Sequence, residues 1–161
     1  MVTINIAYTA PINPAGVEPK LNQAQIWAGL ERKVRHAEEF VAIIVACDVV
    51  SEGQTAKGFS TVTRDVTFKG APAPVREVCT HYAPSRVDFE QDNGSFISNI
   101  VSKGPDGELL MTYSFAWAHP DLADGSPEVE KLEADHWKTA KIAVEGSINT
   151  IRRLVNDKTI Q

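Results

Sequence analysis

The stretch that decides the fold is SFISNIVSKGPDGELLMTYSFAWAH, residues 95–119. Apolar and polar residues alternate on both sides of Pro105–Gly107, which is the pattern of two antiparallel strands joined by a tight turn. Because Pro105 cannot take the positive φ that a two-residue type I′ hairpin requires, we expect a type I turn with Gly107 in a bulge. That register sets Asn99 opposite Tyr113.

The same register predicts one apolar face shared by the two strands. Its members are Ile97, Val101, Met111, Phe115 and Trp117. A similar three-residue turn at 92–94 adds Val87 and Phe89 to this face, whereas a two-residue Asn-Gly turn would direct them away from it. We therefore expect the three-residue turn and a wall rich in aromatic side chains.

The two-residue period extends upstream as far as Val41. It predicts strands at residues 41–51, 57–68, 75–82, 85–90, 95–103 and 108–119. Short turn-forming segments separate these strands, so consecutive strands are expected to pair in antiparallel order. Residues 2–9 alternate in the same way and predict one further strand.

Two segments carry the helical period instead. Asn22 followed by Gln25 resembles a capping box and opens a helix expected over residues 22–40. Its apolar positions are Ile26, Trp27, Leu30, Val34 and Ala37. A long second helix is expected after Gly125, with Ser126 as its cap and Pro127 in its first turn. The inward side of that helix consists of Val129, Leu132, His136, Ala140, Val144, Ser147, Ile151 and Leu154.

This order of elements predicts an α+β fold: a curved antiparallel sheet of about seven strands around a long C-terminal helix, with a shorter helix after the first strand. A chain of 161 residues with 43% hydrophobic content suits a single domain over residues 1–161. A sheet this long must twist and curl, so a helix held in its concave side leaves space between them. We expect that space to be a mostly apolar pocket.

Charge and composition argue against several classes of function. The chain has 16 Lys and Arg against 21 Asp and Glu and no basic run, so no nucleic-acid partner is expected. No window approaches the roughly 20 apolar residues of a membrane span, and the start lacks a signal sequence, so a cytoplasmic location is expected. The four histidines form no H-x-x-x-H or H-x-H pair, and no phosphate loop is visible, so neither a metal nor a cofactor is indicated.

Five local stretches carry a resemblance to a known family. They are YTAPIN at residues 8–13, QIWAGL at 25–30, RDVTF at 64–68, GSFISNI at 94–100 and DGELL at 106–110. In order and spacing the chain resembles the AtaL-like branch of the SRPBCC superfamily, which also contains START proteins and the birch-pollen allergens. The resemblance implies a helix-grip fold with an apolar cavity under the last helix. In the wider superfamily such cavities serve lipid carriage, hormone sensing, polyketide cyclisation and other cofactor-free reactions, and the resemblance assigns no catalytic residue.

The prediction for Arg64 is the one that a structure can contradict most directly. The apolar positions Val62 and Val66 place Arg64 between them on the inward side of its strand. If the next hairpin is centred between Gly70 and Ala71, Arg64 faces Glu77. The pair is either structural, closing one end of the sheet, or directed at a ligand and available for proton transfer.

Other polar candidates lie on the remaining inward surfaces. His136 interrupts the apolar side of the last helix and is either a satisfied core histidine or an acid or base in the cavity. Asn99 either bonds to Tyr113 or a neighbouring carbonyl, or it contacts a ligand. The ligand-binding set is thus expected to be Arg64, Asn99, Tyr113, Phe115, Trp117 and His136.

Three hypotheses about function follow. The first is a binding protein for a small apolar or aromatic organic molecule of secondary metabolism, acting as a monomer or homodimer. The second is a cofactor-free cyclase, isomerase or lyase that acts on a polyketide- or peptide-derived intermediate, with His136, Arg64 and Glu77 as catalytic candidates. The third is an interaction protein whose cavity is filled by its own side chains.

Overall fold

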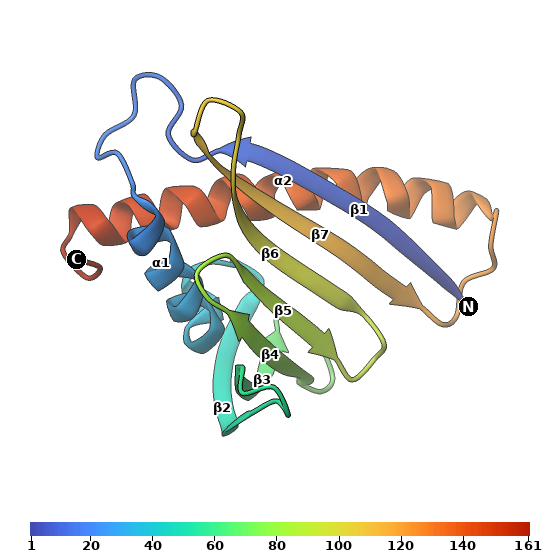
Figure 1. The fold of residues 1–161 in the computed structure, drawn as a ribbon. Helices are drawn as coiled ribbons and strands as arrows, with labels where there is room; N and C mark the ends of the chain where they lie inside the picture. Colours follow the sequence, from blue (N-terminus) through green and yellow to red (C-terminus); the bar gives the residue numbers. More distant parts are fainter.

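The segments with a two-residue period form one antiparallel sheet. A computed structural model describes residues 1–161. The strands are β1 (Val2–Pro11), β2 (Ile44–Gln54), β3 (Ser60–Phe68), β4 (Val75–Tyr82), β5 (Arg86–Gln91), β6 (Phe96–Lys103) and β7 (Leu109–His119). Their order in the sheet is β1-β7-β6-β5-β4-β3-β2, so β2 to β7 form a continuous meander and β1 pairs with β7 (Figure 1). The predicted α+β fold with seven strands is confirmed.

The predicted hairpin registers are confirmed as well. Asn99 lies opposite Tyr113, and Ile97 lies opposite Phe115. In the preceding hairpin Phe89 lies opposite Ile97, as the three-residue turn requires. Gly94 and Gly107 have φ of 91° and 79°, a region that glycine enters without steric cost. These two glycines therefore set which side chains of β5, β6 and β7 face the helix.

The first helix is shorter than its sequence pattern suggests. Helix α1 spans Gln23–Arg35, and Asn22 and Gln25 form the predicted capping box. The backbone leaves the helical region at His36, with φ of −133° and ψ of 54°, and continues as a short 3₁₀ turn, η1 (Ala37–Glu39). The expected continuation of the α-helix to residue 40 is therefore wrong, although residues 37–39 form a 3₁₀ turn.

The second helix is the longest element of the protein. Helix α2 spans Pro127–Asn156 and lies along β1 and β7, with α1 at its C-terminal end (Figure 1). Ser126 occupies the N-cap position, but its hydroxyl makes no hydrogen bond there. Neither α1 nor α2 combines the length and the hydropathy of a membrane-spanning helix.

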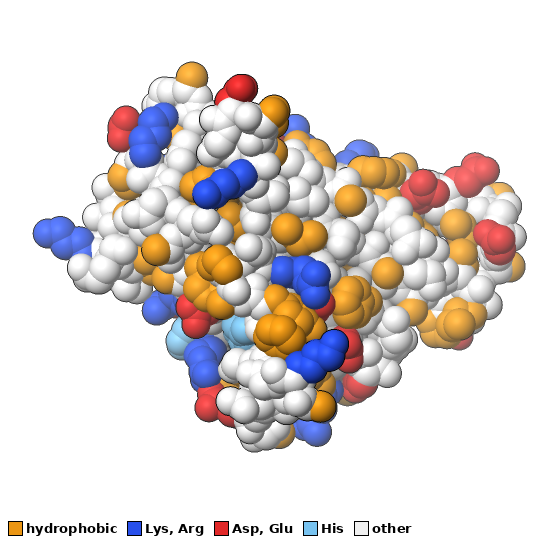
Figure 2. All heavy atoms as spheres, viewed as in Figure 1, with side chains coloured by type: hydrophobic (Ala, Val, Ile, Leu, Met, Phe, Trp, Pro, Cys, Tyr) orange, Lys and Arg blue, Asp and Glu red, His pale blue; other side chains and the backbone are white.

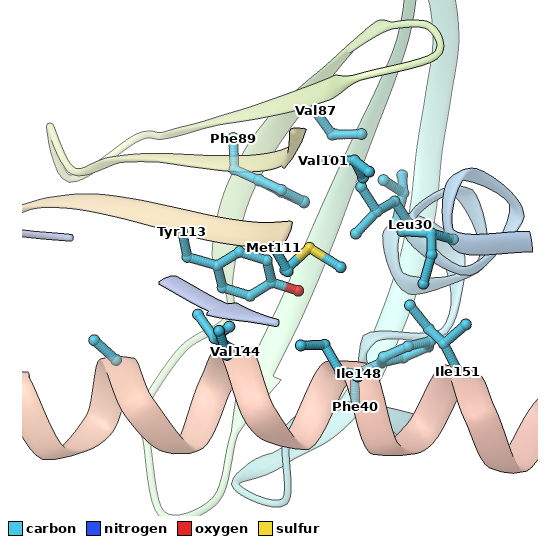
Figure 3. Packing of buried hydrophobic residues seen from close by; sticks show 14 of the residues in the cluster. Leu30, Phe40, Val87, Phe89, Val101, Met111, Tyr113, Val144, Ile148 and Ile151 are labelled. Atoms are coloured by element: carbon cyan, nitrogen blue, oxygen red, sulfur yellow. The ribbon is translucent and has the colours of Figure 1, made fainter. Parts of the chain in front are cut away.

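The core lies between the sheet and α2. Figure 3 shows Tyr113 and Met111 of β7 projecting toward Val144 and Ile148 of α2. The two helices meet at Gly29 of α1, where an added Cβ atom would lie 2.5 Å from Cγ1 of Ile151. On the face of the molecule seen in Figure 2, hydrophobic side chains are interspersed with charged ones.

Candidate functional site

A cavity of about 360 Å³ lies under α2. It is bounded by α1 and η1 at one end, by the inward faces of β3 to β7, and by His136, Thr139 and Ala143 of α2. Most of its lining side chains are apolar, and they include Val41, Ile43, Ile44, Phe68, Phe89, Ile97, Phe115 and Trp117. The volume falls within the usual range for small-molecule sites.

Strand β7 supplies an aromatic wall to this cavity. Tyr113, Phe115 and Trp117 lie two residues apart and project to the same side, because side chains alternate along a strand. The rings of Phe115 and Trp117 are stacked with centroids 4.3 Å apart, and Tyr113 meets Phe115 edge to face at 6.2 Å. All three residues were expected to contact a ligand, and all three line the cavity.

His136 lies at the Trp117 end of the cavity. Its ring centroid is 4.1 Å from that of Trp117, and its Nε2 is 3.0 Å from Nε2 of His119. Burial and, secondly, the neighbouring His119 lower the pKa of His136. Two imidazoles share this contact only when one ring nitrogen donates and the other accepts. His136 is thus held as a neutral, partly exposed base at neutral pH, and its partner His119 was not among the site residues expected from the sequence.

Arg64 of β3 and Glu77 of β4 form a buried ion pair beside the cavity. Nη2 and Nε of Arg64 donate to Oε1 of Glu77 at 2.9 and 3.2 Å, and each residue is 3% exposed. The other oxygen of Glu77 accepts a hydrogen bond from Nε2 of Gln91 at 3.1 Å. The predicted pairing is confirmed. Both residues line the cavity, so the structural and the ligand-directed roles remain predictions.

Arg64 also completes the end of α1. Its Nη1 donates to the carbonyl oxygens of Lys33 and Val34 at 2.9 and 2.7 Å. These carbonyls belong to the last turn of the helix, where no intrahelical donor is available. A positive charge at a helix C-terminus is also favourable for the helix dipole. One guanidinium therefore joins β3, β4 and α1.

Lys33 is a cavity residue that the sequence analysis missed. It is 8% exposed and lines the cavity, and its Nζ donates to Oδ1 of Asn99 at 2.8 Å. Nζ lies 4.3 Å from the ring centroid of Tyr113 and 5.5 Å from that of Phe89. The helical spacing held the signal, because Lys33 continues the inward stripe of Ile26 and Leu30.

Burial governs the charge of Lys33. Desolvation and, secondly, the positive charge of Arg64 lower the pKa of Lys33 to about 7. The negative charge of Glu77 acts in the opposite direction but does not compensate. The amine therefore exchanges its proton close to neutral pH, far below the range of an exposed lysine.

Asn99 fixes the position of the Lys33 amine through a hydrogen bond. It is fully buried and is absent from the cavity lining, in contrast to the aromatic residues of β7. One alternative predicted a hydrogen bond from Asn99 to Tyr113 or to a neighbouring carbonyl, and this is wrong. Oδ1 instead accepts a hydrogen bond from Lys33, and Nδ2 has no hydrogen-bond partner. A ligand contact by Asn99 stays a prediction.

The lowered pKa of Lys33 predicts how stability depends on pH. Between pH 7 and the pKa of an unfolded lysine, the unfolded chain binds a proton that the folded chain does not, so the free energy of unfolding rises with pH. We expect wild type to gain stability from pH 7 to 9 relative to Lys33→Met, which has no proton to lose. Paired urea titrations at these two pH values measure the difference. Parallel changes in the two proteins would show that Lys33 keeps an ordinary pKa.

Comparisons with known proteins agree on family and fold. A family model described as "AtaL: Acetylaranotin biosynthesis cluster protein L" matches residues 6–158. A protein from Aspergillus terreus (strain NIH 2624 / FGSC A1156), described as "Acetylaranotin biosynthesis cluster protein L", is 27% identical over 151 residues. The match covers 94% of this chain and 89% of that protein.

Solved structures share the fold at much lower identity. The KanY protein has a TM-score of 0.61 at 13% identity, covering 94% of this chain and 99% of KanY. The Zhui aromatase/cyclase from Streptomyces sp. R1128 has a TM-score of 0.57 at 17% identity, covering 96% of both chains. The di-domain ARO/CYC StfQ of the steffimycin pathway has a TM-score of 0.63 at 11% identity, covering 98% of this chain and 52% of StfQ.

Proposed function

Because this chain belongs to the acetylaranotin biosynthesis cluster protein L family, we propose that it binds a small apolar or aromatic organic molecule in the cavity under α2, as a step of secondary-metabolite biosynthesis. The observation that carries the proposal is the cavity itself, about 360 Å³ in volume and walled by aromatic side chains. Stacked rings on β7 suit a flat unsaturated ligand. The buried cation of Arg64 and the amine of Lys33 suit a polar group on the ligand.

A second candidate function is catalysis in the same cavity. It is favoured by two nitrogen bases at its opposite ends, His136 with a lowered pKa and Lys33 with a pKa of about 7. The amine of Lys33 exchanges its proton near neutral pH and the neutral imidazole of His136 can accept one, as a cofactor-free cyclase, isomerase or lyase requires. Two of the solved structures with this fold are described as aromatase/cyclases, which makes catalysis a reasonable candidate for this chain.

Filling the cavity is expected to weaken binding. Ala143 lines the cavity from α2, so Ala143→Phe places a ring in the ligand's volume. We expect the affinity for 1-anilinonaphthalene-8-sulfonate to fall by at least about tenfold, or about 1.4 kcal/mol, in a fluorescence titration. Thr139→Phe fills the same space from the next inward turn of α2 and serves if Ala143→Phe does not fold.

The neighbouring residue provides the matched control. Ile142 of α2 is 71% exposed and does not line the cavity, so Ile142→Phe adds the same ring without entering the cavity. Its dye affinity should equal that of wild type. Equal affinity in the wild type and in both cavity-filling variants would mean that the dye binds elsewhere, and the proposed function would lose its support.

The two candidate functions are separated by the fate of the ligand. Polyketide- and peptide-derived intermediates of secondary metabolism are incubated with the protein and analysed by mass spectrometry. Unchanged recovery from a protein–ligand complex supports binding alone. A new product that disappears in His136→Ala or Lys33→Met supports catalysis.

A further inference from the structure

We propose that Lys33 is a nucleophilic amine that condenses with an aldehyde or ketone group of a molecule in the cavity and holds it as an imine. The inference deepens the proposed function, on which it rests, by naming a carbonyl compound as the class of ligand. The ligand would then be bound covalently at Lys33.

The position of Lys33 differs from that of every other lysine in the chain. Lys33 lines the cavity, whereas the rest are exposed: Lys20, Lys57, Lys69, Lys103, Lys131, Lys138, Lys141 and Lys158. Its Nζ donates a hydrogen bond to Asn99 and lies beside the rings of Tyr113 and Phe89. A ligand stacked on the aromatic wall of β7 therefore lies next to a single amine.

The hydrogen bond to Asn99 fits a neutral amine. A neutral lysine has two N–H donors and one lone pair, and Oδ1 of Asn99 engages one donor at 2.8 Å. The lone pair is then free to face a carbonyl carbon in the cavity. Nδ2 of the same amide has no hydrogen-bond partner, so Asn99 engages Nζ through its oxygen alone.

The charges around Nζ favour its neutral form at mild pH. Burial and Arg64 on β3 lower the pKa of the amine to about 7, while the charge of Glu77 on β4 opposes the shift. Burial keeps Cys79 protonated by raising its pKa to about 12, and it raises the pKa of Tyr113 as well, so neither adds a negative charge near neutral pH. The π faces of Tyr113 and Phe89 attract the cation but do not reverse the effect of desolvation. A desolvated lysine beside another cation is a recognised way to activate an amine.

The reaction needs no oxidant or reductant. The lone pair of Nζ forms the new C–N bond, and the π pair of the carbonyl moves to oxygen. A proton passes from nitrogen to oxygen to give the carbinolamine. Loss of the hydroxyl with one more proton from nitrogen releases one water and leaves the C=N bond. Hydrolysis reverses these steps and returns the amine and the carbonyl compound.

Reductive trapping tests the inference. The full chain is incubated at about pH 7.5 with 2-naphthaldehyde and sodium cyanoborohydride, which reduces an imine to a stable naphthylmethyl amine, and the adduct is located by peptide mass mapping. We expect Lys33 to be modified at least about tenfold faster than any exposed lysine, because exposed amines with a pKa near 10.4 are almost fully protonated at this pH. Labelling spread over the exposed lysines and the amino terminus, with Lys33 spared, would overturn it.

Variants and a non-reactive analogue separate the imine from simple binding. Lys33→Met should bind 2-naphthalenemethanol, measured by tryptophan fluorescence, but lose the fast adduct, and Lys33→Arg is the second variant if the first does not fold. Lys141→Met removes an exposed lysine of α2 and should leave fast labelling intact. Wild type that binds the alcohol without trapping the aldehyde at Lys33 refutes the imine and leaves the cavity function standing. Wild type that binds neither compound refutes both.

Discussion

Arg64→Ala is expected to lower the free energy of unfolding by about 3–5 kcal/mol, the usual cost of leaving a buried charge without its partner. The variant leaves Glu77, which is 3% exposed, with only Gln91 as a hydrogen-bond partner. It also removes the donor to the carbonyls of Lys33 and Val34, so the last turn of α1 loses its cap. Urea titration followed by circular dichroism measures the loss.

The same hairpin offers a matched control. Asp65 and Arg76 pair directly beside Arg64 and Glu77, with hydrogen bonds of 2.8 and 2.9 Å, but on the exposed face of the strands. Arg76→Ala should therefore cost much less than Arg64→Ala, since exposed ion pairs contribute little. A similar cost for both variants would show that burial does not set the strength of the Arg64 pair.

A double-mutant cycle divides the loss between the two partners of Arg64. Glu77→Ala combined with Arg64→Ala should cost less than the sum of the single variants, because the double variant leaves no unpaired charge. The remaining cost reports the cap of α1. Arg64→Lys should fall between wild type and Arg64→Ala, since one ammonium group cannot reach a carboxylate and two carbonyls in the same geometry. Additive single costs would contradict the pairing.

The second large effect is expected where the two helices touch. A Cβ atom at Gly29 would lie 2.5, 2.6 and 3.0 Å from three side-chain carbons of Ile151, so Gly29→Leu forces α1 and α2 apart. Overpacking of this kind costs about 1–3 kcal/mol or more, which exceeds the gain of up to about 1 kcal/mol from replacing a helical glycine. We expect a net loss of stability in thermal and urea unfolding.

Relief of the contact provides the internal test. Ile151→Ala alone removes a fully buried side chain and should cost about 2–5 kcal/mol, but in combination with Gly29→Leu the new side chain fills the space. The double variant should be more stable than the two losses added together. Gly146 of α2 has no atom within 4 Å of an added Cβ, so Gly146→Ala should stabilise the protein. Destabilisation by Gly146→Ala would show that glycine in these helices matters for a reason other than close packing.

Much of the sheet could be predicted from alternation alone. A shift of one residue exchanges the two faces of a strand, so Val62, Arg64 and Val66 had to face inward together. The same reasoning found the aromatic wall of β7, because Tyr113 and Phe115 share one parity. Strand registers follow from local turns, and local turns are visible in sequence.

The helix-to-sheet contacts could not be predicted in this way. Lys33 was overlooked because a lysine near a helix end is usually exposed, and only the position of α1 against β6 and β7 brings its amine to Asn99. His136 was expected on the inward side of α2, but its contact with His119 depends on where the loop of residues 120–126 places α2. The carbonyls of Lys33 and Val34 at the end of α1 likewise have their donor on a distant strand residue, Arg64.

The cap on α1 sets an order for the synthesis of this protein. Helix α1 is synthesised before Arg64 and Glu77, and α2 with Ile151 follows all the strands. Chains begin to fold from the N-terminus as they emerge, but here the last turn of α1 and the outer wall of the cavity wait for later segments. We therefore expect the nascent chain to carry the apolar face of its sheet uncovered until residues 127–156 are released, which makes this the stage at which it depends most on chaperones.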